Sequence, residues 1–294
     1  MFKQLGLIGC GLMGGSFALA LKRAGLVGQV VGYSPSPTTL AKARQIGAID
    51  MAADSALLAV AGSDIVLLAV PVAATEATLK AIHQGVTADT LVMDVGSTKR
   101  DVADAARRAL GERLGSFVPA HPIAGKESAG IDHADAQLYS GCRVVLTPLP
   151  ETRPEQLSKA TDVWSALGCR VTQMSAEEHD AAFAAVSHLP HLLAFAYYAS
   201  IAQQTAGAQF LALAGPGFRD FTRIAAADPV MWRDVLISNR EEILQQSQRF
   251  RAQLDAFEQL MQTTEPKALE SLIREASASR SSWKMNSSPV GGER

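Results

Sequence analysis

A glycine-rich turn near the N-terminus most constrains the fold of this chain. Gly9, Gly11 and Gly14 follow the short apolar run 5–8 and stand where a helical pattern begins, at 13–24. Glycines in this setting permit a tight turn and let backbone N–H groups and a helix N-terminus approach a pyrophosphate. Alone, such a triplet is a weak signal, because a glycine-rich turn can also serve close helix–strand packing. At the first strand–helix junction of an alternating chain, it predicts dinucleotide binding.

Short apolar runs of strand length alternate with helical patterns through the first half. The predicted strands are 5–8, 30–32, 65–70, 91–95, 117–120, 144–147 and 170–173, and the predicted helices are 13–24, 38–46, 72–83, 99–110 and 154–167. Near-continuous apolar strands separated by helices predict a parallel sheet that is covered on both faces. From a capping box at Ser175 and Glu178 to about Ser279, only helical patterns occur. We therefore expect an α/β Rossmann-type dinucleotide-binding domain over 1–170, followed by an all-α dimerisation domain over 171–280.

Two helices of the second half are unusual. Residues 191–203 are apolar nearly all round, which is typical of a buried helix. Asp228 and Pro229 form an N-cap and N1 pair for a helix predicted to reach about Gln262, roughly 50 Å at 1.5 Å per residue. Such length favours packing against a second subunit over a purely intrachain role. Beyond Ser277 the serine-rich sequence predicts disorder, so that residues 281–294 form a disordered tail.

Composition argues against several classes of function. The chain of 294 residues is 48% hydrophobic and carries a net charge of −2, which gives no reason to expect nucleic acid or an anionic membrane as partner. Its three cysteines, Cys10, Cys142 and Cys169, are far apart and odd in number, so they predict neither a metal site nor a disulfide framework. We find no signal-peptide pattern and no apolar run long enough to span a bilayer. We expect a soluble cytoplasmic protein.

The stretch 121–130 is the leading candidate for chemistry. It places His121, Lys126 and Glu127 with two glycines between apolar strands, and it has neither helical nor strand periodicity. A polar, glycine-hinged loop that leaves a buried strand is where an open α/β sheet presents its functional groups. We predict that His121 is catalytic; the alternative is a turn with a surface histidine.

The end of the second predicted strand bears on the choice of cofactor. An acidic residue there would bond the ribose 2′-hydroxyl and favour NAD. Here Ser34 and Ser36 follow the strand, and both can donate to a 2′-phosphate that no carboxylate repels. The sequence predicts NADP over NAD, although Pro35 stands where an arginine would decide the matter, and use of both stays open. The predicted cofactor contacts are Gly9, Gly11, Leu12, Met13, Gly14, Ser34, Ser36 and Val70.

Two further polar pairs lie in positions where they could meet the catalytic loop. Ser97 and Thr98 follow a predicted strand, so they are natural caps for the next helix, and Ser97 could still touch a substrate. His188 and His191 stand three residues apart at a helix start and would share one face. A metal site there would lack a third nearby ligand, so no metal is predicted.

Arg219 and Arg223 stand four residues apart in the glycine-led segment 215–223, which is otherwise mostly apolar. If this segment is helical, both guanidinium groups share a face that suits bidentate recognition of a carboxylate. The alternative is an arginine paired with Asp220 or Asp228, and for Arg219 the two possibilities are equally weighted.

These motifs together resemble the prephenate/arogenate dehydrogenases of tyrosine biosynthesis. The resemblance covers roughly residues 3–280 and is carried by the segments 9–14, 94–99, 121–127, 187–191 and 217–223. It implies oxidative decarboxylation of prephenate to 4-hydroxyphenylpyruvate, of arogenate to tyrosine, or of both, with NAD(P)⁺ as hydride acceptor. Hydride would leave the ring carbon that bears the hydroxyl, and the ring carboxylate would leave as CO₂.

The resemblance also implies roles for residues. Neutral His121 would take the proton of the ring hydroxyl, and Ser97 would orient that hydroxyl or the histidine. Glu127 would gate access or pair with a neighbouring subunit, and the helical domain would form a homodimer. The implied substrate contacts are Arg223, Arg219, His191, His188 and Glu127. Neither the preference between prephenate and arogenate nor inhibition by tyrosine follows from the sequence.

Other classes of protein remain as alternatives. A β-hydroxyacid dehydrogenase would need a catalytic lysine early in the helical domain, but no lysine occurs between Lys159 and Lys267. An imine or ketone reductase would not need His121 beside a cation cluster. A dinucleotide-sensing dimer would explain the glycines and the long helix, but it would leave His121, His191 and Arg223 without a role.

Overall fold

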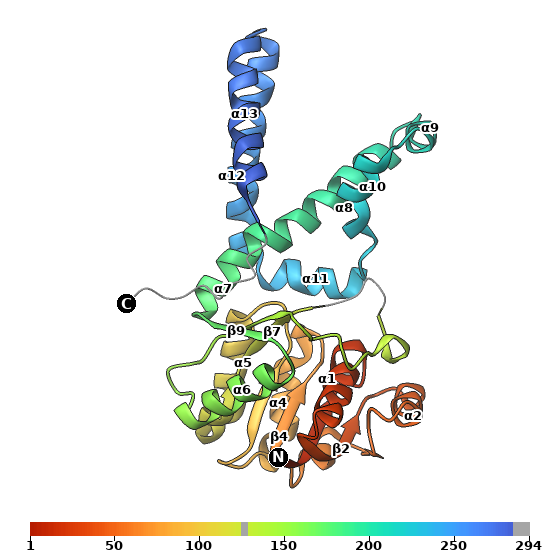
Figure 1. The fold of residues 1–294 in the computed structure, drawn as a ribbon, viewed down its shortest axis with the longest axis vertical. Coiled ribbons are helices and arrows are strands. Elements are labelled where there is room, and N and C mark those ends of the chain that lie inside the picture. Colours follow the sequence, from red (N-terminus) through yellow and green to blue (C-terminus); the bar gives the residue numbers. More distant parts are fainter. Residues whose placement is uncertain (125–128, 285–294) are drawn as a thin grey trace.

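The computed structural model describes residues 1–124 and 129–284. Its first half is a six-stranded parallel sheet in the order β3-β2-β1-β4-β5-β6, with helices on both faces (Figure 1). The strands are β1 (Phe2–Ile8), β2 (Val27–Tyr33), β3 (Met51–Ala52), β4 (Ile65–Leu68), β5 (Leu91–Asp94) and β6 (Phe117–Val118). The helices of this half are α1 (Leu12–Arg23), α2 (Pro37–Gln45), α3 (Ala56–Val60), α4 (Thr75–Ile82), α5 (Arg100–Leu110) and α6 (Pro154–Ala166).

Both faces of this sheet are buried, as the apolar strands predict. In β4, Ile65 and Leu67 belong to one core cluster, whereas Val66 and Leu68 belong to the cluster on the opposite face. Strand β1 pairs in parallel with β2 on one side and β4 on the other, so that the chain changes direction across the sheet at this point. Ligands of open α/β sheets bind at the carboxyl ends of strands beside such a switch point.

The single continuous sheet that the sequence suggests is divided in the structure. After β6 the chain leaves the parallel sheet at Pro119, and a second sheet forms from β7 (Ala120–Ile123), β8 (Arg143–Leu146) and β9 (Arg170–Gln173). Strand β7 runs antiparallel to β8, and β8 runs parallel to β9. Pro119 lacks the N–H that a continuing ladder would need. His121 consequently stands inside β7, opposite Val145, and not in a loop as predicted.

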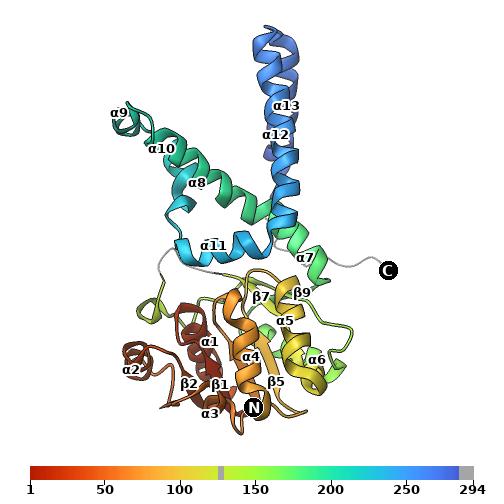
Figure 2. The same ribbon diagram turned by 180° about the vertical axis from the view of Figure 1, so that it is seen from behind.

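The second half of the described chain is helical, as predicted. It comprises α7 (Ala176–Phe183), a π-helical turn (Ala184–His188), α8 (Leu189–Ala202), α9 (Gly207–Ala212), α10 (Pro216–Thr222), α11 (Pro229–Ser238), α12 (Arg240–Gln262) and α13 (Pro266–Ser282). Figures 1 and 2 show two arms that rise from the α/β half, one of α8–α10 and one of α12 with α13, while α11 lies across the sheet end. Within the described residues, no helix is both long and apolar enough to cross a membrane.

The prediction of a single long helix from Asp228 to Gln262 is wrong, because α11 ends at Ser238 and a separate helix, α12, begins after Asn239. Asp228 does cap α11, with its side chain accepting from the N–H of Met231 at 2.8 Å. At the other end of the chain, α13 continues to Ser282, so the disorder expected from Ser277 does not begin there. Residues 285–294 of the predicted tail lie outside the described residues.

Candidate active site

The glycine turn joins the end of β1 to α1. Gly9 has φ +94°, and a side chain there would collide with the Ala69 carbonyl oxygen at 2.2 Å. Gly14 packs so closely that a Cβ would meet the Gly9 oxygen at 2.1 Å, whereas Gly11, at the N-cap of α1, faces open space. A turn that is closed beneath the first and third glycines and open above the second leaves the helix N-terminus free to receive a pyrophosphate.

At the end of β2, the two predicted serines hold a second helix start. Ser36 caps α2, with its Oγ accepting from the N–H of Thr39 at 3.2 Å, and the Oγ of Ser34 accepts from the N–H of Ser36 at 3.3 Å. Both oxygens act as acceptors in these bonds, so their own hydrogens remain able to donate. Strand β2 ends in register with β1, where Tyr33 is the partner of Ile8. The serines therefore lie at the same sheet edge as the glycine turn.

Three side chains form a hydrogen-bonded chain that ends at His121. The Nδ1 of His121 lies 2.8 Å from the Nε2 of His179, and the Nδ1 of His179 lies 2.7 Å from the Oδ1 of Asp180. His179 and Asp180 are both fully buried at the start of the helical half, in α7. Phe183, one turn further along α7, packs against both imidazole rings. The catalytic candidate of the sequence thus has a buried support that comes from the next domain.

The hydrogen-bonded series Asp180–His179–His121 determines the tautomer of His121. A carboxylate can only accept, so His179 donates from Nδ1 to Asp180 and, when neutral, keeps Nε2 as an acceptor. His121 then donates from Nδ1 to His179, which leaves its own Nε2 with a lone pair. Burial, together with the nearby positive charge of Lys99, holds the pKa of His121 well below its usual range. His121 is therefore neutral at pH 7, with Nε2 available to accept a proton.

Asp180 also anchors the start of α5. Burial would raise the pKa of this carboxyl, but the hydrogen bonds from His179 and from the backbone N–H groups of Arg100 and Lys99 outweigh burial and lower the pKa. The N–H groups lie at 2.9 and 2.8 Å at a helix N-terminus, where a negative charge is favoured. The expectation that Ser97 and Thr98 cap this helix is wrong, because a carboxylate from α7 occupies that position.

Ser97 and Thr98 have different surroundings. Thr98 is buried, and its hydroxyl lies 2.9 Å from the Oγ of Ser238 in α11, which ties the two halves of the chain together. Ser97 is half-buried at the carboxyl end of β5, and its hydroxyl has no hydrogen-bond partner among residues 1–124 and 129–284. Ser97 is therefore the one of the two that can still contact a small molecule.

A buried ion pair fixes the residue before His121. Lys99 and Asp94 are fully buried against each other, with Lys99 Nζ bonded to Asp94 Oδ2. The other Asp94 oxygen accepts from the N–H of Ala120 at 2.9 Å, and Lys99 donates to the carbonyl oxygen of Ala120 at 2.8 Å. Both backbone groups of Ala120 are held in this way. The pair positions the backbone of β7 and places a positive charge near His121.

The two predicted histidines of the helical half have separate environments. His188 is buried, accepts at Nδ1 from the Asn239 amide at 3.0 Å, and has its pKa lowered to about 4 by burial. His191 is half-buried and stacks on Trp232, with ring centroids 3.6 Å apart. Burial lowers the pKa of His191 despite its hydrogen bond to the Ser187 carbonyl, and the charge of Arg223 lowers it further.

The two arginines predicted to bind substrate have different surroundings. Arg223, just after α10, is near enough to His191 for its charge to act on that ring. Arg219 is ion-paired with Asp220 at 3.0 Å on the exposed surface of α10, the arrangement that the sequence left open as the alternative. Glu127, the remaining predicted substrate contact, lies outside the described residues.

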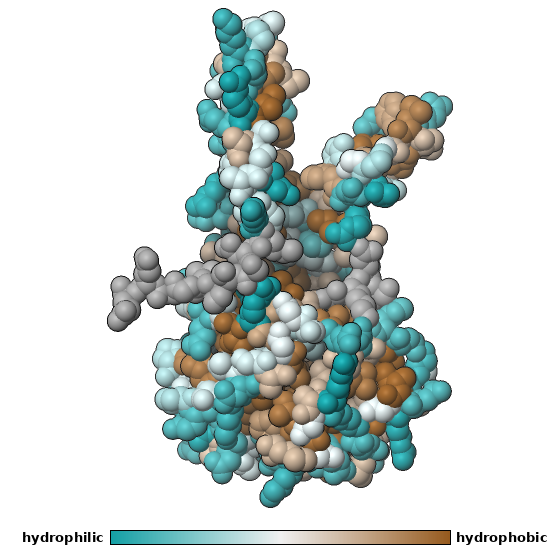
Figure 3. Space-filling model, in the orientation of Figure 1, coloured by the Kyte–Doolittle hydropathy of each residue, from teal (hydrophilic) through white to brown (hydrophobic). Residues whose placement is uncertain are grey.

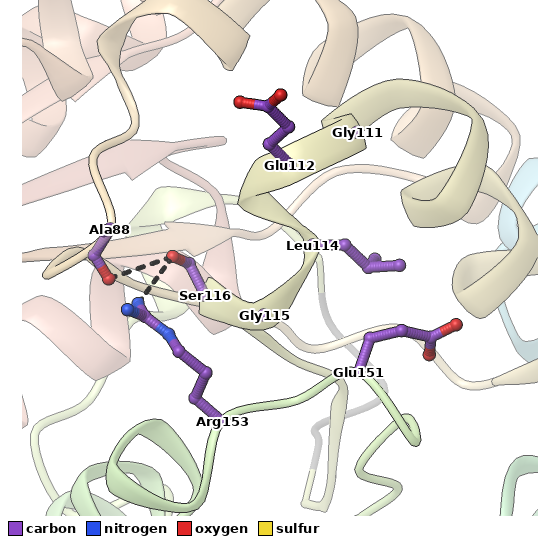
Figure 4. A pocket seen from close by; sticks show the side chains of 8 residues that line it. All are labelled: Ala88, Gly111, Glu112, Leu114, Gly115, Ser116, Glu151 and Arg153. Atoms are coloured by element: carbon purple, nitrogen blue, oxygen red, sulfur yellow. Dashed lines mark hydrogen bonds between the residues drawn. The ribbon is translucent and has the colours of Figure 1, made fainter.

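Figure 4 shows a cavity of about 310 Å³ whose lining includes Ala88, Ser116 and Arg153. Ala88 and Ser116 precede β5 and β6, so the cavity lies at the amino ends of these strands, the opposite edge of the sheet from His121. Arg153 donates to the Oγ of Ser116 at 3.1 Å there, and that hydroxyl bonds the Ala88 carbonyl. None of the residues predicted for the site lines this cavity. Ligands of parallel sheets bind at the carboxyl ends of the strands, so this cavity is not the candidate active site.

Several residues of the site have no counterpart among the sequence predictions. These are His179 and Asp180 in the polar chain, Asp94 and Lys99 in the buried pair, and Trp232 and Asn239 beside the other histidines. One usable signal was present, because the adjacent His179 and Asp180 follow the capping box at Ser175, which the structure contains. Nothing in their spacing shows that they are buried beside His121.

The fold and this site together define a class of protein. A Rossmann-type sheet with a glycine turn open to a pyrophosphate, together with a neutral, half-buried histidine just past the carboxyl end of β6, is that of a pyridine-nucleotide-dependent oxidoreductase.

Comparison with known protein families identifies the family within this class. Residues 17–173 match the family model of the prephenate dehydrogenase nucleotide-binding domain, and residues 175–275 match that of its dimerization domain. The chain belongs to the prephenate dehydrogenase family. This confirms both the resemblance found in the sequence and the predicted fold class.

Individual relatives agree with this assignment. Prephenate dehydrogenase of Bacillus subtilis is 35% identical over 85% of this chain and 67% of its own length. Cyclohexadienyl dehydrogenase of Zymomonas mobilis is 33% identical over 86% of this chain and 87% of its own length. A solved A. aeolicus prephenate dehydrogenase, in complex with hydroxyphenyl propionate and NAD⁺, is 36% identical with a TM-score of 0.88, covering 95% of this chain and 97% of that one. Synechocystis arogenate dehydrogenase is 29% identical with a TM-score of 0.81, covering 95% and 99%.

Proposed function

We propose that this chain oxidatively decarboxylates prephenate, arogenate or both, and transfers the hydride to NAD(P)⁺. The observation that carries the proposal is the chain from Asp180 through His179 to His121, because it presents a neutral Nε2 at the sheet edge that also holds the glycine turn. Removal of a hydride from a carbon that bears a hydroxyl needs a base for the hydroxyl proton, and a neutral imidazole is suited to that task.

In the proposed reaction His121 accepts the proton of the ring hydroxyl at Nε2 as hydride leaves the same carbon. The positive charge that forms on the imidazole is stabilised through Nδ1 by His179 and, beyond it, by the Asp180 carboxylate. Loss of the ring carboxylate as CO₂ leaves its bonding electrons in the ring, which becomes aromatic. His121 can then return the proton to the phenolate oxygen, so the imidazole is neutral again at the end of the cycle. Ser97, which stands just after the carboxyl end of β5, would orient the substrate hydroxyl.

The cofactor fits the residues at the carboxyl ends of β1 and β2. Bound NAD(P)⁺ would supply the acceptor for the hydride, and the open face of Gly11 leaves room for its pyrophosphate. Leu12 and Met13 continue the turn, and Val70 lies just after β4 at the same edge. We propose NADP as the preferred form, with NAD also accepted. Ser34 and Ser36 keep hydrogens that can be donated to a 2′-phosphate at the N-terminus of α2.

Arg223 is the proposed carboxylate ligand of the substrate. Its guanidinium acts on His191, which stacks on Trp232 and so forms a flat half-buried wall. We propose that this wall packs against the ring of the substrate and that Arg219 assists only if its pairing with Asp220 opens. For Glu127, which lies outside the described residues, the two roles named above, gating access or pairing with a neighbouring subunit, both stay open. His188 is proposed to hold the wall in place through Asn239 and not to touch the substrate.

We further propose that residues 171–280 form the dimerisation domain of a homodimer. The arms carry large apolar side chains that are exposed in a single chain, visible as brown surface on both arms in Figure 3. Examples are Leu213, Phe221 and Met261, with exposed fractions of 85%, 55% and 65%. Large apolar side chains left exposed in this way mark interaction sites between subunits. Sedimentation equilibrium at micromolar concentration tests this; a monomer would contradict it.

The test of the proposed activity mixes the purified chain with prephenate or arogenate, each with NAD⁺ or NADP⁺, and follows reduced nicotinamide by absorbance. Turnover is expected in at least one combination, with NADP⁺ faster than NAD⁺. Absence of turnover in all four combinations, in protein that binds the cofactor, would overturn the dehydrogenase proposal and favour a reductase or a sensor.

A further inference from the structure

Two thiols that are far apart in the sequence meet at the start of the second sheet. Cys142 and Cys169 each stand one position before the register pair Arg143 and Arg170, which opens the parallel ladder of β8 and β9. Their sulfur atoms lie 3.6 Å apart although 27 positions separate them in the chain. Neighbouring strands are spaced about 4.8 Å apart, and disulfides join Cα atoms about 4.4–6.8 Å apart. The backbone therefore already stands at a separation that a disulfide can bridge.

The two sulfurs have unequal environments. Cys142 is half-buried beside the exposed Gly141, whereas Cys169 is buried. The contact between the two sulfurs and the nearby charge of Arg170 together lower the pKa of the Cys142 thiol, and burial only partly opposes them. The neighbouring Cys142, together with burial, raises the pKa of Cys169. Cys142 is therefore the more acidic and more reactive of the two thiols, and Cys169 is the less acidic thiol beside it.

We propose that Cys142 and Cys169 form a reversible intrachain disulfide when the protein meets a hydroperoxide. Cys142 Sγ attacks one peroxide oxygen, the O–O bond breaks, and the departing oxygen leaves as water or alcohol once it takes up a proton. The resulting sulfenic acid is then attacked by Cys169 Sγ, the S–O bond breaks, and a second molecule of water leaves with the Cys169 proton. Two thiols lose two electrons in total, which reduce the peroxide.

The pair is connected to the glycine turn through one side chain. The thiol of Cys169 donates to the Tyr139 carbonyl at 3.3 Å, and the buried Tyr139 hydroxyl donates to the Met13 carbonyl at 2.7 Å. Disulfide formation removes the first of these donors. If the turn binds the cofactor, as proposed above, the oxidised chain binds NAD(P)⁺ about three- to tenfold more weakly, the effect of disturbing one hydrogen bond.

The primary test does not depend on the enzyme activity. Fully reduced protein is treated with hydrogen peroxide at a small excess, and its intact mass and proteolytic peptides are measured. The expected result is the loss of two hydrogen atoms per chain, a peptide that links Cys142 with Cys169, and full reversal by dithiothreitol. Unreacted thiols, higher oxidation of Cys142 without a link, or a link between two chains would each overturn the proposal.

Three variants separate the roles of the cysteines. Cys169→Ser lacks the resolving thiol, so Cys142 should stop at a sulfenic acid that dimedone traps. Cys142→Ser should not react at all. Cys10→Ala is the matched control and should form the bond like the parent chain, because burial raises the pKa of Cys10 to about 12 and leaves it inert. Formation of a linked peptide in Cys142→Ser would contradict the assignment.

Titration of NAD⁺ and NADP⁺ into reduced and oxidised protein tests the connection through Tyr139. Weaker binding by the oxidised form supports it, and equal affinities would show that the connection is wrong although the disulfide forms. If neither form binds either nucleotide, the proposed cofactor function fails, and the mass measurement still decides the disulfide.

Discussion

The glycine turn and the histidine chain are built in opposite ways. The turn takes all its residues from 9–14, and its shape follows from the positive φ of Gly9 and from the close packing of Gly14 against the Gly9 carbonyl, which leaves no room for a Cβ. The histidine chain joins His121 to a ring 58 positions further along, in another half of the molecule. The first is encoded locally, and the second exists only once two domains have packed together. Substitutions in the two regions should therefore separate cofactor binding from catalysis.

The largest expected effect is on chemistry alone. His121→Asn removes the base, and we expect kcat to fall by about 10²–10⁴-fold, the usual contribution of general acid–base catalysis. Cofactor affinity, measured by nucleotide titration, should stay unchanged. The matched change in the other region is Gly11→Val, which fills the open face of the turn and should abolish cofactor binding first. Equal loss of nucleotide affinity in both variants would break the comparison.

Lowering the pH should destabilise the fold through the buried histidines and not through the glycine turn. His188 is 1% exposed and its folded-state pKa is about 4, so the unfolded chain takes up a proton at higher pH than the folded one. The unfolding free energy should therefore fall as the pH is lowered from about 6.5 to about 4, by roughly 3 kcal/mol from this residue. Urea unfolding across this range measures it. His188→Gln should flatten the dependence, and an unchanged slope would contradict the assignment.

Arg223→Ala probes substrate binding on the helical side of the comparison. A charge-assisted hydrogen bond to a carboxylate is worth about 1.5–3 kcal/mol, so KM for the substrate should rise about 10- to 100-fold while kcat changes little. Arg219→Ala is the control and should have a smaller effect, because that side chain is already paired with Asp220. Steady-state kinetics with saturating cofactor decide between them. A fall in kcat at unchanged KM would show that Arg223 acts on the chemistry.

The smallest expected effect concerns the choice of nucleotide. Ser36→Asp keeps an N-cap acceptor for α2, so the helix should fold as before. The new carboxylate would stand where we place the 2′-phosphate, and the repulsion of about 1–2 kcal/mol should weaken NADP⁺ about tenfold relative to NAD⁺. Titration of each nucleotide measures the ratio. An unchanged ratio would show that the 2′-position lies elsewhere.

The same contrast explains what the sequence could reveal of the fold. Strands such as β1 and β4 were predictable because apolar runs are a local property. The two residues of β3 and the five of α3 were missed because elements this short carry no period. The break at Asn239 was missed because its amide bonds the Asp180 carbonyl and His188, both remote in sequence.

For the candidate site, His121 could be proposed from its polar loop-like surroundings, and the cofactor turn from its glycines. The two residues that support His121, His179 and Asp180, could not be proposed from the sequence, since an adjacent histidine and aspartate after a capping box usually face solvent. Only the packing of α7 against α5 turns them inward, where Asp180 replaces the cap that was expected from Ser97. Buried polar chains are a property of the assembled fold, not of the spacing of their members.

The central claim is that the buried chain leaves His121 neutral, with Nδ1 protonated and Nε2 bare. The most direct measurement is the pair of ring ¹⁵N chemical shifts of His121 at pH 7, in protein labelled at its 6 histidines and assigned by comparison with His121→Asn. We predict a protonated Nδ1 and an unprotonated Nε2, a state that persists as the pH falls below 6.5. A protonated Nε2 at pH 7, in either the opposite tautomer or the imidazolium, would contradict the account.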